Sequence, residues 1–273
     1  MKKERVDVLL VERGLCETRE KAKRSIMAGL VYSNTERIDK PGLKIDRDTP
    51  LTIKGDVLPY VSRGGLKLEK AIKEFNIDFT DKVVLDIGAS TGGFTDCSLQ
   101  NGAKFVYALD VGYNQLAWKL RQDKRVEVME RTNFRYVERD HLKFGLPDIA
   151  TIDVSFISLK LILPVLKSIL KQNGDVIALI KPQFEAGREE VGKKGIVRDP
   201  ATHRRVIREM VDFSRSEGYH VLHLSYSPIT GGDGNIEFLL HLSLAPEEER
   251  SFNASIIDEV VEDAHHAFKK ERD

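Results

Sequence analysis

Cysteine is scarce in this chain. The 273 residues include only Cys16 and Cys97, which lie far apart and outside any C-x-x-C pair. Two distant thiols cannot staple a small secreted domain, and they are too few for a structural zinc site. The sequence therefore excludes a disulfide scaffold and a cysteine-bound zinc centre, and we expect no metal. This cysteine usage is typical of a reducing compartment, so we expect a cytoplasmic protein.

Long apolar runs are missing as well. A membrane-spanning helix needs about 18 consecutive apolar residues, and no stretch of the sequence approaches that length. The first apolar run is interrupted by Glu12 and Arg13, which is unlike a secretory signal peptide. We therefore expect a soluble intracellular protein with no membrane partner.

A net charge is also lacking, but the two signs are distributed unevenly. The whole chain balances 43 Lys plus Arg against 43 Asp plus Glu, whereas residues 1–63 carry 14 basic and 10 acidic residues. A slightly basic head before a mildly acidic body suggests a contact with nucleic acid. The length exceeds one average domain, so two unequal domains are expected.

The head reads as two helices followed by a small sheet. Val6–Val11 is an apolar run suited to a helix, and Thr18 is placed to cap a second helix that stops at Gly29. The segments Val31–Asn34 and Leu51–Lys54 are predicted strands. The second helix carries basic residues on its outer side: Arg19, Lys21, Lys23 and Arg24. A solvated helix face is the alternative explanation of these charges.

This head resembles the RNA-binding module named after ribosomal small-subunit protein four. The resemblance is carried by R-x-D-x-L-L at 5–10, T-R-x-x-A at 18–22 and I-x-x-G-x-V at 26–31. It implies that the head grips RNA through phosphate contacts and backbone shape more than through bases. The candidate RNA-binding residues are Arg5, Arg19, Lys21, Lys23, Arg24 and Arg63.

A glycine-rich turn stands at the centre of the chain, in VVLDIGASTGGFT at 83–95. Glycines after an apolar strand let the backbone approach a ligand closely. The spacing is not that of the dinucleotide fingerprint, because Ser90 stands where the second glycine is required. A ligand with ribose hydroxyls and a cationic amino acid fits better than a pyrophosphate, which favours S-adenosylmethionine. The alternative is a glycine turn that merely packs a helix on a strand.

Asp110 supports the cofactor hypothesis. It ends the next predicted strand about twenty residues after Gly88, where a doubly wound fold places the carboxylate that binds a ribose. The candidate cofactor-binding residues are Asp86, Gly88, Ser90, Gly92, Gly93, Phe94, Asp110 and Asn133.

Strands and helices alternate through most of the chain, which predicts a Rossmann-like α/β fold with a mostly parallel seven-stranded sheet. The predicted strands are Val83–Asp86, Phe105–Asp110, Val126–Met129, Asp148–Asp153, Asp175–Ile180, Val221–Ser225 and Ile236–Leu244. No helix separates the last two strands, so one of them should run antiparallel. Helices are expected at Leu159–Leu170 and Ala201–Gly218.

Three segments are expected in all. Residues 1–60 form the small α+β head and include a linker at Gly55–Tyr60, residues 61–245 form the α/β domain, and residues 246–273 form a helical extension with apolar residues at helical spacing.

Four charged residues should meet at one edge of the sheet. Asp153 and Lys181 follow the carboxyl ends of two strands, where ligands of open α/β sheets bind. Glu237 opens the antiparallel last strand and so reaches the same edge, while Lys67 comes from the helix before the glycine turn. Lys181 follows an apolar strand and precedes Pro182, which sets it apart from ordinary surface charges.

Methyl transfer to a ribose hydroxyl needs in-line approach of the oxygen, removal of its proton and a positive group near the oxyanion. Lys181 is the candidate that meets the 2′-oxygen, either as an ammonium that stabilises the alkoxide or as a base. Asp153 and Glu237 would hold the two lysines. The sequence leaves both roles of Lys181 open.

Long motifs across almost the whole chain are similar to those of the TlyA family of ribosomal RNA methyltransferases, whose catalytic half is of the FtsJ type. They are LDIGASTGGFT, ALDVG, ERTNFR, TIDVSFISL, IKPQFEAG and GNIEF, preceded by YVSRGGLKL. The resemblance implies a Lys-Asp-Lys-Glu tetrad at Lys67, Asp153, Lys181 and Glu237. It also implies S-adenosylmethionine as cofactor and cytidine 2′-hydroxyls of large-subunit rRNA as substrate. The basic head and the C-terminal helix favour the longer form, which also acts on small-subunit rRNA.

Three other functions fit the sequence less well. Enzymes that methylate exocyclic amines carry two prolines after the fourth strand, and Asp153-Val154-Ser155-Phe156 has neither. A haemolysin, a label that the family also carries, would need a spanning helix or a long amphipathic hairpin. An RNA chaperone with an inactive domain gives no reason for the four charges.

Overall fold

The computed structural model describes residues 3–27, 29–55, 58–192, 194–231, 234–245 and 252–269. Contacts divide the chain into two compact units, Met1–Pro59 and Tyr60–Asp273. Parts of two expected segments lie outside the described residues: 56–57 of the linker, and 246–251 and 270–273 of the helical extension.

The smaller unit contains the two expected helices, α1 at Val6–Glu12 and α2 at Arg19–Met27. The hydroxyl of Thr18 accepts a hydrogen bond from the backbone N–H of Lys21 at 3.2 Å, so the predicted cap is confirmed. The core of this unit is small and apolar and comprises Val6, Leu9, Leu10, Cys16, Ala22, Ile26, Val31, Ile38 and Leu51.

Short strands complete the smaller unit. Strand β1 (Lys3–Arg5) pairs with β4 (Lys44–Asp46), and a second sheet has the order β3 (Glu36–Ile38), β2 (Val31–Ser33), β5 (Thr52–Ile53). The sequence predicted β2 and β5 only. The other three strands have three residues each, which is too short to display an alternating pattern.

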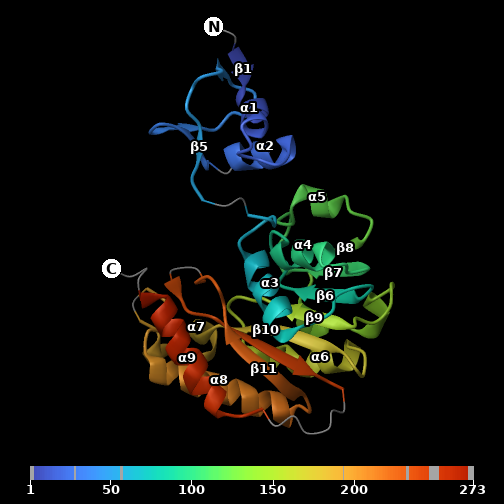
Figure 1. The fold of residues 1–273 in the computed structure, drawn as a ribbon. Helices are drawn as coiled ribbons and strands as arrows, with labels where there is room; N and C mark the ends of the chain where they lie inside the picture. The colour runs from blue at the N-terminus through green and yellow to red at the C-terminus, as the bar shows by residue number, and fades with distance from the viewer. Residues whose placement is uncertain are drawn as a thin grey trace. The chain divides into compact units, whose positions relative to one another are not determined.

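A seven-stranded sheet forms the centre of the larger unit (Figure 1). Its strands are β6 (Val83–Ile87), β7 (Phe105–Leu109), β8 (Val126–Met129), β9 (Ile149–Ile152), β10 (Asp175–Ile180), β11 (His220–Tyr226) and β12 (Phe238–Ser243). They are arranged in the order β11-β12-β10-β9-β6-β7-β8, and only β12 runs antiparallel to its neighbours. The predicted mostly parallel sheet is therefore confirmed.

Helices cover both faces of this sheet. One layer contains α3 (Gly64–Phe75), α4 (Gly93–Gln100) and α5 (Trp118–Arg121), and the other contains α6 (Leu163–Ile169), α8 (Pro200–Ser216) and α9 (Ser255–Ala267). Neighbouring strand residues alternate between the two layers, as Val84 and Leu85 do. In Figure 1 the orange and red helices α8 and α9 lie together on the same side.

Shorter turns connect these elements: α7 (Pro182–Glu185), and the 3-10 turns η1 (Phe134–Tyr136), η2 (Arg139–His141), η3 (Leu159–Leu161) and η4 (Arg188–Glu190). The prediction of a single helix at Leu159–Leu170 was wrong, because this segment is divided into η3 and α6. Pro164 stands in the first turn of α6, where its missing N–H costs nothing, and so a new helix starts there.

Two further boundaries differ from the prediction. Strand β12 begins at Phe238, so Glu237 lies just before the strand, and β6 extends to Ile87, so Asp86 lies inside a strand. Among the residues described, no helix has the length and apolarity required to cross a bilayer.

Candidate active site

The order of the strands reverses between β6 and β9, and the turns that follow these two strands touch. The backbone N–H of Asp153 donates to the Ile87 carbonyl at 3.0 Å. A Cβ added to Gly88, whose φ is +86°, would lie 2.4 Å from the Asp153 carbonyl oxygen. Glycine is therefore required here by both conformation and space. In an open α/β sheet such a reversal is where ligands bind.

A cavity of about 450 Å³ opens at this point and is lined by the turns after β6, β7, β8 and β9. Four of the candidate cofactor-binding residues line it: Gly88, Ser90, Asp110 and Asn133. The Asp110 carboxylate accepts hydrogen bonds from the backbone N–H groups of Ser90 and Gly112, each at 2.7 Å. These bonds fix the carboxylate while its remaining lone pairs stay available for hydroxyl donors.

A second cavity of about 370 Å³ adjoins the first, because Gly88, Ser90, Asp153 and Ser155 line both. Its other lining residues include Arg63, Gly93, Phe94, Lys67, Lys181 and Glu237. The first cavity combines apolar walls with a carboxylate, which suits an adenosine, and the second is polar and charged. Together they fit a ligand that carries a nucleoside at one end and a charged amino acid at the other.

Two predicted cofactor-binding residues line neither cavity. Asp86 is fully buried, and its carboxylate accepts hydrogen bonds from the hydroxyls of Thr95 at 2.7 Å and Thr151 at 3.1 Å. Burial raises the pKa of Asp86 to about 7. A Cβ on Gly92 would lie 2.3 Å from Leu120 Cδ1, so this glycine serves packing. Both residues shape the turn from beneath, in line with the packing alternative.

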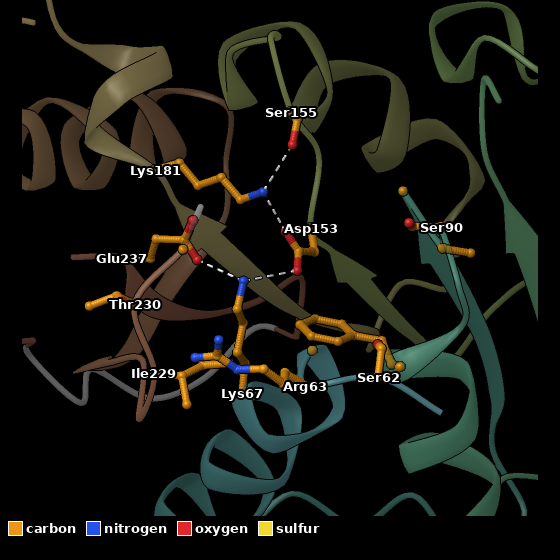
Figure 2. Close-up of a pocket in the computed structure, with 16 residues that line it drawn as sticks. Ser62, Arg63, Lys67, Ser90, Asp153, Ser155, Lys181, Ile229, Thr230 and Glu237 are labelled. Atoms are coloured by element: carbon orange, nitrogen blue, oxygen red, sulfur yellow. Dashed lines mark hydrogen bonds and ion pairs between the residues drawn. The ribbon is translucent and has the colours of Figure 1, made fainter. Parts of the chain in front are cut away.

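The four predicted catalytic residues converge in one chain of ion pairs, as Figure 2 shows. Lys67 Nζ lies 2.7 Å from Glu237 Oε2 and 3.3 Å from Asp153 Oδ2. Lys181 Nζ lies 2.6 Å from Asp153 Oδ1 and donates to the Ser155 hydroxyl at 3.3 Å. Asp153 thus bridges the two ammonium groups. Lys181 is the last member of this row of ion pairs and lies beside the junction of the cavities.

The sheet register explains this convergence. Ile180 pairs with Phe238, and β12 is antiparallel to β10. Glu237 therefore enters the sheet at the edge where Lys181 leaves it. Helix α3 contacts α4 and β12 and brings Lys67 to the same edge.

Burial makes these charges interdependent. The side chains of Lys67 and Glu237 are 9% and 3% exposed. Burial alone lowers the pKa of Lys67, but Asp153 and Glu237 outweigh it, so its pKa lies above the ordinary value. Burial alone raises the pKa of Asp153, but Lys67 and Lys181 outweigh it, so its pKa lies below the ordinary value. Each buried charge is thus paired, which limits the cost of its desolvation.

Sequence reasoning missed two residues of the loop after β9. Ser155 accepts a hydrogen bond from Lys181, and Phe156 is 90% exposed at the wall of the larger cavity. Phe156 has a φ of +64°, which for a bulky residue is strained by about 1–3 kcal/mol. Nothing in the sequence pattern signals this conformation, because phenylalanine normally avoids it.

Four of the five predicted RNA-binding residues of the smaller unit are engaged in ion pairs. The buried carboxylate of Asp7 forms ion pairs with Arg5 and Arg19, each at 2.9 Å. The hydrogen bonds and charges of these guanidiniums lower the pKa of Asp7 to about 2. Lys21 pairs with Glu17, and Lys23 with Glu20. Arg24 is exposed and makes no ion pair with the residues that the structure describes. Phosphates would therefore compete with acidic side chains for most of these cations.

Two family models match the chain. Residues 60–244 match the FtsJ-like methyltransferase model and residues 4–49 match the S4 domain model. The two matched ranges lie in the larger and the smaller unit respectively.

Three known proteins are similar over nearly the whole chain. YqxC of Bacillus subtilis (strain 168), named as a candidate rRNA methyltransferase, is 67% identical and covers 99% of this chain and 97% of its own. The 16S/23S rRNA (cytidine-2'-O)-methyltransferase TlyA of Mycobacterium tuberculosis (strain ATCC 25618 / H37Rv) is 40% identical. The match covers 94% of this chain and 95% of the relative. The structure of a candidate hemolysin from Streptococcus thermophilus has a TM-score of 0.78 at 57% identity. The match covers 100% of this chain and 99% of that protein.

Proposed function

The chain belongs to the FtsJ-like methyltransferase family and carries an S4 domain, and from that premise we propose that it methylates ribose 2′-hydroxyls of ribosomal RNA. The observation that carries this proposal is the chain of ion pairs Glu237–Lys67–Asp153–Lys181 beside the junction of two cavities. An enzyme that transfers a methyl group to a hydroxyl needs a cation at the oxygen, and Lys181 supplies one.

S-adenosylmethionine, when bound, supplies a methyl group on a sulfonium, which needs no further activation as an electrophile. The residues that would hold it are Gly88, Ser90, Asp110 and Asn133 in the larger cavity, with Gly93 and Phe94 in the smaller one. In this assignment Asp86 and Gly92 support the turn and do not touch the cofactor.

Lys181 is the proposed group at the 2′-oxygen. An ammonium has three donors, and Asp153 and Ser155 take two of them, which leaves one for a substrate oxygen. Lys67 is enclosed by two carboxylates, so its charge is offset more completely. We therefore assign Lys67 and Glu237 to holding Asp153 and balancing charge. Lys181 is assigned to the 2′-oxygen, either as the ammonium that stabilises the oxyanion or as the base that removes the proton of the hydroxyl.

RNA would be held at both units. The exposed ring of Phe156 at the cavity wall can stack on an unpaired base, and Arg63 lines the cavity that contains the tetrad. Arg5, Arg19, Lys21, Lys23 and Arg24 of the smaller unit would bind phosphates. In this scheme residues 1–60 bind RNA, 61–245 catalyse and 246–273 extend the catalytic domain.

Cytidine is the proposed target nucleoside, in large-subunit and also small-subunit rRNA, because the TlyA relative is named for that activity on both. The proposed substrate places the reaction in the cytoplasm.

The test is to identify the methylated nucleoside. Ribosomal subunits from cells that lack the gene would be incubated with the protein and with S-adenosylmethionine labelled in its methyl group, and the rRNA would be digested to nucleosides. We expect the label on the ribose of cytidine. Label on a nucleobase would refute the ribose assignment and favour a base methyltransferase.

A further inference from the structure

Glu185 is an acid beside the active site that the proposed mechanism does not use. It ends α7, four residues after Lys181, and is half-buried. Its Oε2 accepts a hydrogen bond from the Ser158 hydroxyl at 2.6 Å, and its Oε1 accepts one from the backbone N–H of Leu159 at 2.8 Å. Both oxygens are therefore bound to the first residues of one segment, the start of η3.

That segment ends the loop that carries the catalytic groups. The loop runs from Asp153 through Ser155 and the strained Phe156 to Ser158. A strained backbone persists only where surrounding contacts determine it. The upstream end is fixed by the hydrogen bond of the Asp153 N–H to Ile87, and Glu185 fixes the downstream end.

The loop after β9 and the loop after β10, which carries Lys181 and Glu185, meet at two other points. Lys181 is bound to Asp153 and Ser155, and the ring of Phe184 lies 5.0 Å from the ring of Phe156. These two contacts involve a cation that must be free to meet substrate and a ring that is 90% exposed. The contact through Glu185, unlike these two, leaves both groups free to act.

We infer that Glu185 is a positioning residue, which clamps the loop after β9 to the loop after β10 so that Ser155 and Phe156 are held beside Lys181. The carboxylate touches neither cavity and acts through the loop. The kinetic part of this inference rests on the proposed function.

A first experiment needs no RNA, because Val154 to Ile157 line the larger cavity. Glu185→Ala should speed hydrogen exchange of the Leu159 amide and weaken binding of S-adenosylmethionine about tenfold, through misplacement of the loop. Glu185→Gln can still accept from the Leu159 N–H and can donate to the Ser158 oxygen, so it should restore most of the affinity. Glu189→Ala, at a nearby exposed acid, is the matched control.

Unchanged Leu159 exchange and unchanged cofactor affinity in Glu185→Ala would overturn the clamp, whether or not the wild-type protein methylates rRNA. A failure of the wild-type protein to methylate rRNA would instead refute the proposed function and leave this binding test decisive for Glu185.

A second experiment measures single-turnover methyl transfer with saturating cofactor and rRNA. Glu185→Ala should lower the rate about tenfold or more, with rescue by Glu185→Gln. In a Phe156→Ala background the same substitution should cost clearly less, because both act through one loop. Equal losses in the two backgrounds, or no rescue by glutamine, would contradict positioning through the loop.

Discussion

At the scale of single residues, Asp153 is the group that connects the two halves of the site. Its two carboxylate oxygens bind different lysines, Lys67 at 3.3 Å and Lys181 at 2.6 Å. The same residue donates its backbone N–H to the carbonyl of Ile87 at the end of β6, and its own carbonyl oxygen is closely approached by Gly88. A single residue thus fixes Lys181, the proposed catalytic cation, relative to the glycine turn after β6. Ordinary surface charges would not be buried in such a chain.

Asp86 should give the stability of the protein a pH dependence. The ordinary pKa of 3.8 is raised to about 7 by burial in the fold. Between these values the folded chain binds more protons than the unfolded chain, so its free energy of unfolding falls as the pH rises, by roughly 4 kcal/mol at most. Above about pH 7 no further loss from this group is expected.

Asp86→Asn removes this titration while leaving an amide that can bond to both threonines. We expect denaturant unfolding between pH 4 and 7 to show a flatter pH dependence in this variant. Asp140→Asn, at an exposed acid, should retain the wild-type profile. A wild-type slope in Asp86→Asn would show that other groups carry the dependence.

At the scale of elements, the turn between β6 and α4 is determined by space. Gly88 and Gly145 both have positive φ, at +86° and +100°, but only at Gly88 would a Cβ meet another atom within 4 Å. Gly145→Ala should therefore cost only backbone strain, about 1 kcal/mol. Gly88→Ala should cost more stability and also weaken cofactor binding at least about tenfold, since the turn must move away from Asp153.

Calorimetric titration of both variants with S-adenosylmethionine, together with denaturant unfolding, would measure this difference. If both glycine variants bound the cofactor equally well, close backbone approach at Gly88 would not be what forms the cavity.

How much of the site the sequence could predict depends on the kind of contact. The strand ends were readable from apolar runs, and an antiparallel last strand requires Lys181 and Glu237 to share an edge. The sequence did not show that β6 continues through Ile87, which turns the side chain of Asp86 into the α4 layer and away from the edge. The clamp through Glu185 and the strain at Phe156 depend on contacts between loops, which have no periodic pattern.

At the scale of the whole molecule, the two units have different proposed roles: the smaller binds RNA and the larger catalyses the reaction. The smaller unit carries more basic than acidic residues, but Asp7 and other acids pair with four of its predicted RNA-binding cations. Deleting residues 1–60 should weaken rRNA binding and reduce the dependence of log K on log salt, because fewer phosphate contacts release fewer counterions. Cofactor affinity should be unchanged. Equal RNA affinity and an equal salt slope after deletion would assign these charges to a solvated surface.

The most direct test of the account is the single-turnover rate of Lys181→Ala at saturating S-adenosylmethionine. Lys181 lines the smaller cavity and not the larger one, and saturating cofactor keeps any change in cofactor affinity out of the measured rate. The rate should fall about a hundredfold or more, because the developing oxyanion loses its cation or the hydroxyl loses its base. Lys160→Ala, at an exposed lysine of η3, is the control and should retain the wild-type rate. An unchanged rate in Lys181→Ala would contradict the assignment of this lysine to the 2′-oxygen.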